Sequence, residues 1–147
     1  MARELQTDED LRRVLSEVRT VAVLGAHVNP AKPACYVPDY LHTQGYRIIP
    51  VNPQFAGRRE RWGERFRSTL AEIGEPVDLI DVFRRSDAIP EHLDDILALT
   101  PRPQAVWLQQ GIRNDDAAAA LVVAGIDVVQ DHCTLADHRR FGLGPRR

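Results

Sequence analysis

Cysteine is scarce in this chain. The two cysteines, Cys35 and Cys133, are too few for a disulfide framework, so we expect a reducing compartment. No apolar run approaches the ~20 residues of a membrane helix, and the net charge of −2 provides no general attraction to nucleic acid or to an anionic membrane. The amino-terminal residues carry acids where a signal peptide has its apolar core. We therefore expect a cytoplasmic protein, monomeric or homodimeric, that binds neither nucleic acid nor membranes.

The glycine motif of dinucleotide-binding proteins is also missing. That motif needs a glycine-rich loop after the first strand and an acidic residue at the end of the second strand. Here only Gly25 follows the first apolar run, and the second apolar run ends in Val51, Asn52 and Pro53. Both requirements for binding NAD through this motif therefore fail.

Short apolar runs alternate with helical patterns along the chain. We expect strands at 21–24, 46–51, 77–83, 105–108 and 126–129, and a short edge strand near 65–67. We expect helices at 7–18, from about Tyr40 to Gln44, at 69–73, at 89–97 and from Asn114 to Gly125. This order predicts a single doubly wound, Rossmann-like α/β domain over 1–147, with a mostly parallel sheet of five to six strands and helices on both faces. Residues 1–19 form its amino-terminal helix region, and 131–147 form a carboxyl-terminal extension.

The loop after the first strand has the features of a phosphate-binding loop. We expect it to run from Gly25 to Cys35, longer than the about 2–6 residues usual between a strand and a helix. Lys32, the single lysine among 19 basic residues, lies in this loop. A lysine ammonium group, backbone N–H groups and a helix start together can bind a diphosphate.

The sequences at the ends of the predicted strands, taken together, resemble those of a known family. The segments concerned are residues 25–33, 45–53, 76–85, 106–112 and 131–138. In this order they resemble the small stand-alone CoA-binding domains related to the N-terminal domain of the succinyl-CoA ligase α subunit. The resemblance covers nearly the whole chain and implies that coenzyme A, or an acyl-CoA, lies across the carboxyl ends of the strands.

The resemblance also implies roles for individual residues. It places the diphosphate on the first loop and the floor of the nucleotide site after the second strand. It places the adenosine near the ends of the second and fourth strands, on the side of Val82, Phe83 and Arg84. The residues implied are Gly25, Ala26, His27, Lys32, Val51, Asn52, Pro53, Val82, Phe83, Arg84, Gln109 and Gly111. Arg84 and Arg85 are suited to the 3′-phosphate of CoA, and a solvated charge pair is the alternative reading of these two arginines.

Catalytic and metal-binding patterns are not evident in the sequence. The spacing of His132, Cys133 and His138 matches no standard zinc site, and no nucleophile–histidine–acid set is recognisable. His42 and His92 are expected on helix surfaces. Because the ligase relatives keep their catalytic machinery in further domains, we expect a CoA-binding protein with no catalytic residues of its own.

Two other functions remain open at this point. One is an NADP-dependent oxidoreductase in which Arg58 and Arg59 contact the 2′-phosphate. The other is a regulatory protein that senses acyl-CoA and acts through a partner.

Overall fold

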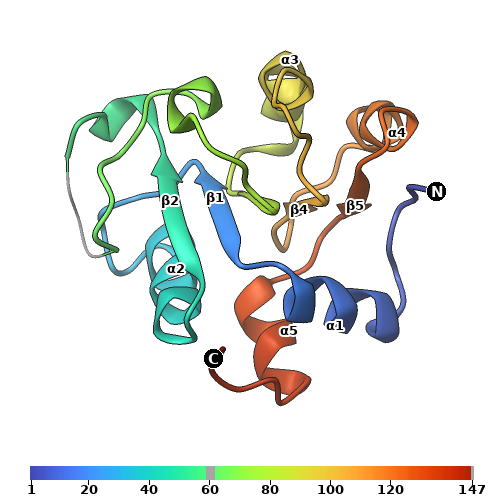
Figure 1. Ribbon diagram of the computed structural model, residues 1–147, viewed down its shortest axis with the longest axis horizontal. Helices are drawn as coiled ribbons and strands as arrows, with labels where there is room; N and C mark the ends of the chain where they lie inside the picture. Colours follow the sequence, from blue (N-terminus) through green and yellow to red (C-terminus); the bar gives the residue numbers. More distant parts are fainter. Residues whose placement is uncertain (59–61, 147) are drawn as a thin grey trace.

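Five parallel strands form one sheet in the computed structural model, which describes residues 1–58 and 62–146 (Figure 1). The strand order is β2-β1-β3-β4-β5, and every neighbouring pair is parallel. The strands are β1 (Thr20–Leu24), β2 (Arg47–Val51), β3 (Leu79–Val82), β4 (Ala105–Leu108) and β5 (Asp127–Val129). The predicted doubly wound α/β fold is thereby confirmed.

Helices cover both faces of the sheet. On one face lie α1 (Asp8–Glu17), α2 (Pro33–Thr43) and α5 (Thr134–Arg140), and on the other lie α3 (Leu93–Leu97) and α4 (Asp115–Val123) (Figure 1). Short 3-10 helices complete the chain: η1 (Pro53–Phe55), η2 (Leu70–Ile73) and η3 (Ser86–His92). Side chains alternate along each strand, so the sheet separates two apolar cores. Val21 and Val23 pack in the core beneath α1 and α2, whereas Ala22 and Leu24 pack in the opposite core.

Two helix starts predicted from polar residues are confirmed. The Thr7 side chain accepts a hydrogen bond from the Asp10 amide at the start of α1, and the Asn114 side chain accepts one from the Ala117 amide at the start of α4. The acids in the first turn of each helix face its positive end.

The start of α2 differs from the prediction. The helix begins at Pro33 and includes Cys35, so the preceding loop is confined to residues 25–32. Proline is compatible with a first helical turn. Pro38, farther along, has no N–H for the Ala34 carbonyl, and that carbonyl instead accepts a hydrogen bond from the His27 amide at 3.1 Å. The carbonyl that Pro38 leaves free therefore holds the first loop against α2.

Two other segments also differ from expectation. The predicted edge strand at 65–67 is reduced to isolated bridge residues, one of which pairs Arg67 with Val51. The predicted helix at 89–97 is divided into η3 and α3, and His92 at their junction is half-buried rather than on the surface. The carboxyl-terminal extension contains α5, which packs against α1 and α2. No described helix has the length and apolar character needed to cross a membrane.

Candidate functional site

The carboxyl ends of β1 and β3 approach each other closely at Gly25. Its φ is +90°, and a Cβ atom added there would lie 2.5 Å from the Phe83 carbonyl oxygen, so only glycine fits. The Gly25 amide donates to the Val51 carbonyl, and the Phe83 amide donates to the Leu24 carbonyl, both at 2.8 Å. These bonds join the ends of β2, β1 and β3. The chain changes direction across the sheet between β1 and β3, which is where doubly wound folds bind their ligands.

Asn52 fixes the loop after β2. Its side-chain nitrogen donates to the Ala26 carbonyl at 2.9 Å, and its side-chain oxygen accepts from the Gln54 amide at 3.0 Å. The amide side chain thus links the loops that follow β1 and β2. Asn52 therefore fixes the backbone of both loops at the carboxyl edge of the sheet.

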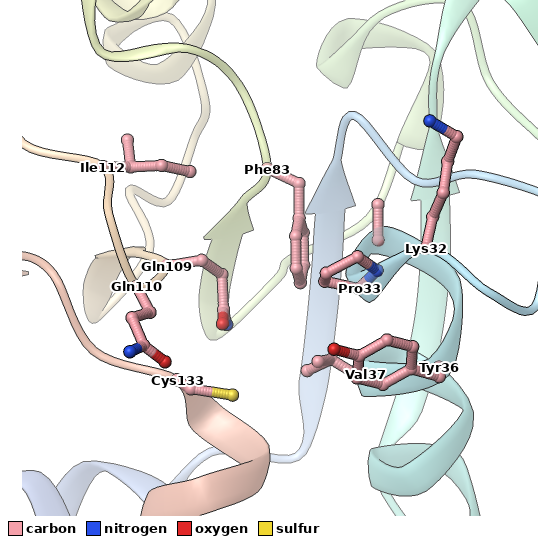
Figure 2. Close-up of a pocket in the computed structure, with 10 residues that line it drawn as sticks. Lys32, Pro33, Tyr36, Val37, Phe83, Gln109, Gln110, Ile112 and Cys133 are labelled. Carbon is pink, nitrogen blue, oxygen red and sulfur yellow. The ribbon is translucent and has the colours of Figure 1, made fainter.

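A pocket of about 410 Å³ opens on the α2 and α5 side of Phe83. Most of its wall is apolar, so we call it the apolar pocket. Figure 2 shows Phe83 between Pro33 on one side and Gln109 and Ile112 on the other, while Lys32 extends its ammonium group away from Val37. The lining residues are Lys32, Pro33, Ala34, Tyr36, Val37, Phe83, Gln109, Gln110, Ile112 and Cys133.

A buried hydrogen-bonded group lies behind the apolar pocket. Gln109 donates through Nε2 to Asp81 Oδ1 at 2.5 Å and to Thr134 Oγ1 at 2.8 Å, and Thr134 donates to Asp81 Oδ2 at 3.1 Å. Asp81 and Thr134 are completely buried. Burial raises the pKa of Asp81 to about 7, although the hydrogen bonds from Gln109 and Thr134 oppose that rise. The carboxyl group can therefore change charge near neutral pH.

A smaller pocket of about 130 Å³ lies on the other side of Gly25, toward η2 and η3. We call it the arginine pocket, because Arg84 lines it. Arg84 Nε and His92 Nε2 are buried nitrogens without a hydrogen-bond partner among the residues described. Burial lowers the pKa of His92, and the nearby Arg84 lowers it further. The lining residues are Leu24, Gly25, Val51, Asn52, Pro53, Ser68, Thr69, Leu70, Arg84, His92 and Asp95.

The predicted site residues divide between these two pockets and their surroundings. Lys32, Phe83 and Gln109 line the apolar pocket. The arginine pocket is lined by Gly25, Val51, Asn52, Pro53 and Arg84. The predicted residues that line neither of the two pockets are Ala26, His27, Val82, Arg85 and Gly111.

Those five residues have other contacts. Ala26 and Val82 are buried in the two cores. The Gly111 amide donates to Asp131 Oδ1 at 2.6 Å. Arg85 is largely exposed and pairs with Asp87 at 3.2 Å. Their binding roles remain predictions.

His27 is held within the protein. Its amide donates to Ala34, its Nδ1 atom accepts a hydrogen bond from the Asn29 amide at 3.0 Å, and its ring packs edge-on against Phe55. Burial lowers the pKa of His27, and Lys32 adds to this effect. The Nδ1 acceptor and the lowered pKa favour the neutral imidazole.

Three residues of the site were not identified from the sequence: Asp81, Thr134 and His92. Asp81 interrupts an apolar strand, which is a signal for a buried polar group with partners. Thr134 and His92 carry no such local signal, because their positions depend on how α5 and η3 pack. Within residues 1–58 and 62–146, no three His, Cys, Asp or Glu side chains are grouped as a metal site requires. Arg59, named for the NADP alternative, lies outside the described residues.

The fold and the pockets define a doubly wound α/β protein with cavities on both sides of the point where the strand order reverses. In this class, nucleotide ligands bind at that edge of the sheet. Residues 19–139 match the CoA binding domain family, and the chain belongs to that family.

Two individual proteins are similar to this chain over most of its length. YneT of Bacillus subtilis strain 168 is 33% identical over 129 residues, which cover 88% of this chain and 92% of YneT. The structure of cell-free ID.343 from Thermus thermophilus is 50% identical, with a TM-score of 0.86, and the match covers 92% of this chain and 98% of that one.

A more distant likeness concerns the fold alone. An acetyl-coenzyme A synthetase of Ca. Korarchaeum cryptofilum is 22% identical with a TM-score of 0.62. The match covers 81% of this chain and 27% of the synthetase chain.

Proposed function

We propose that this protein binds coenzyme A or an acyl-CoA across the carboxyl edge of its sheet and has no catalytic machinery of its own. The observation that carries the proposal is the pair of pockets on either side of the Gly25–Phe83 contact, in a chain of the CoA binding domain family. CoA has a matching division, because a diphosphate joins its adenosine to a long arm of methyl, methylene, hydroxyl and secondary amide groups.

The apolar pocket suits the arm of CoA. Its walls are formed mainly by proline, valine, isoleucine and aromatic side chains, and its volume is within the range of small-molecule sites. An acyl group on the thiol would extend the same arm. Lys32 is exposed at this pocket and at the start of α2, so its ammonium group can pair with the diphosphate.

The arginine pocket suits the 3′-phosphate and the part of the adenosine next to it. Two buried nitrogens there, Arg84 Nε and His92 Nε2, have no hydrogen-bond partner among the described residues. Buried polar atoms ordinarily have partners. A phosphate would supply an acceptor for Arg84 Nε, and a purine edge would supply a partner for His92 Nε2. The Gly25–Phe83 contact lies between the two pockets, so a diphosphate that links their occupants would cross the edge of the sheet there.

Isothermal titration calorimetry with CoA, NAD and NADP tests this function. We expect saturable binding of CoA and none of NAD or NADP. CoA at 100 times its dissociation constant should also add about 2.7 kcal/mol to the free energy of unfolding. Saturation by NADP with no heat from CoA or acetyl-CoA would overturn the proposal and favour the oxidoreductase.

A further inference from the structure

Gln109 is a buried polar residue in the wall of a mainly apolar pocket. It directly follows β4, and only 4% of it is exposed. Figure 2 shows its amide beside Phe83, inside the ring of residues that lines the pocket. A polar side chain in this setting needs partners for both of its polar atoms.

The nitrogen of this amide is already occupied inside the protein. It donates to Asp81 Oδ1 and to Thr134 Oγ1, behind the pocket. Above its pKa of about 7, Asp81 is ionised and only accepts hydrogen bonds, so the nitrogen of Gln109 must then face it. Thr134 uses its own hydroxyl proton for Asp81 Oδ2, and its oxygen can then accept from Gln109. Two buried residues therefore fix which way the amide points.

The oxygen of the amide remains for the pocket. Gln109 Oε1 receives no hydrogen bond from the residues described and is not one of the completely enclosed polar atoms without a partner. The pocket thus offers one oriented acceptor within walls that are otherwise mainly apolar. A ligand that places an N–H group at this point would satisfy it.

We infer that Gln109 is a specificity-determining residue that accepts a hydrogen bond from a secondary amide of the bound arm, and that Asp81 and Thr134 are the positioning residues that orient it. This inference rests on the proposed function, because the arm of CoA carries secondary amides. It adds a requirement that apolar burial alone does not impose: the arm must present an N–H donor beside Phe83.

Calorimetry on paired ligands tests the inference. CoA carries the arm, whereas adenosine 3′,5′-bisphosphate lacks it and reports on the other pocket. We expect Gln109→Met to weaken CoA binding by about 5- to 10-fold, the usual consequence of losing one hydrogen bond in a buried site. Binding of adenosine 3′,5′-bisphosphate should stay within about twofold, since the arginine pocket is unchanged. Gln6→Met is the matched control, because Gln6 is exposed and lines neither pocket, and it should leave both affinities unchanged.

Two further measurements separate positioning from folding. Thr134→Val should weaken CoA binding, and Thr134→Ser, which keeps the hydroxyl group, should restore it. The wild-type protein should also bind a CoA analogue with N-methylated arm amides about 5- to 10-fold more weakly than CoA, and this test needs no variant.

The outcomes distinguish the two proposals. A folded wild-type protein that does not bind CoA contradicts the proposed function. Wild-type binding that is equal for CoA and its N-methylated analogue, or a Gln109→Met variant that binds CoA normally, overturns only the role of Gln109. Equal losses for CoA and adenosine 3′,5′-bisphosphate would show that Gln109 serves the fold, which also overturns the inference.

Discussion

Replacing Asp81 by asparagine should change how the stability of the protein depends on pH. The carboxyl group is completely buried between β1 and β4 in the sheet, and burial raises its pKa from an ordinary 3.8 to about 7. Asparagine has the same shape, can accept from Gln109 and can donate to Thr134, but it does not ionise. The substitution therefore removes the titration and retains the hydrogen-bonded group.

The direction in which the free energy of unfolding changes with pH follows from the raised pKa of Asp81. Between pH 3.8 and about 7 the folded protein holds a proton on Asp81 that the unfolded chain has lost. The free energy of unfolding must then fall as pH rises through this range, because ionisation favours the unfolded chain. At 1.36 kcal/mol for each pKa unit, the whole effect is about 4 kcal/mol, of which about 3 kcal/mol falls between about pH 5 and pH 8.

Urea denaturation of wild type and Asp81→Asn at these two pH values measures the effect. We expect the free energy of unfolding of the variant, minus that of wild type, to rise by about 3 kcal/mol from about pH 5 to pH 8. Thr134→Val removes a donor to the carboxylate, so its stability should fall more steeply with pH than that of wild type. A difference that stays constant with pH would show that Asp81 does not titrate in this range and would refute the reasoning.

Three further predictions concern the ligand. Lys32→Ala should weaken CoA binding by roughly 10- to 100-fold, because a charge-assisted contact is lost. Arg13→Ala on α1 should have no effect. Equal CoA affinities for the two variants would show that Lys32 does not contact the ligand. Arg84→Ala should reduce the ratio of the affinity for CoA to the affinity for 3′-dephospho-CoA. An equal loss of affinity for both ligands would show that Arg84 does not contact the 3′-phosphate. Cys133 lines the apolar pocket and Cys35 is 1% exposed, so with oxidised CoA the thiolate of Cys133 should attack the disulfide and release one CoA thiolate. Intact mass should show one reducible CoA adduct that Cys133→Ser abolishes and Cys35→Ser does not; no adduct, or loss of the adduct in Cys35→Ser, would contradict this.

Local patterns were sufficient to predict most of the fold. The apolar run at 105–108 became β4 with the same bounds, and the polar caps Thr7 and Asn114 marked two helix starts. The start of α2 was placed too late, because Pro33 and Pro38 look like helix breakers in sequence. In the structure, Pro33 occupies the first turn and the His27 amide uses the carbonyl that Pro38 leaves free. That compensation depends on a tertiary contact, which a local pattern does not contain.

The candidate site was only partly predictable. Residues that follow parallel strands share one edge of the sheet, which is why Gly25, Asn52 and Phe83 lie together there. The group formed by Asp81, Gln109 and Thr134 depends on the register of β3 with β4 and on the packing of α5. Sequence spacing determines neither, and the polar sequence of α5 gave no periodic signal for a buried helix.

A crystal structure of the protein with CoA tests the central claim most directly. We expect the arm in the apolar pocket with an amide nitrogen beside Gln109, the diphosphate over Gly25 near Lys32, and the 3′-phosphate at Arg84. Electron density for CoA away from the carboxyl edge of the sheet, or with adenosine in the apolar pocket, would contradict it.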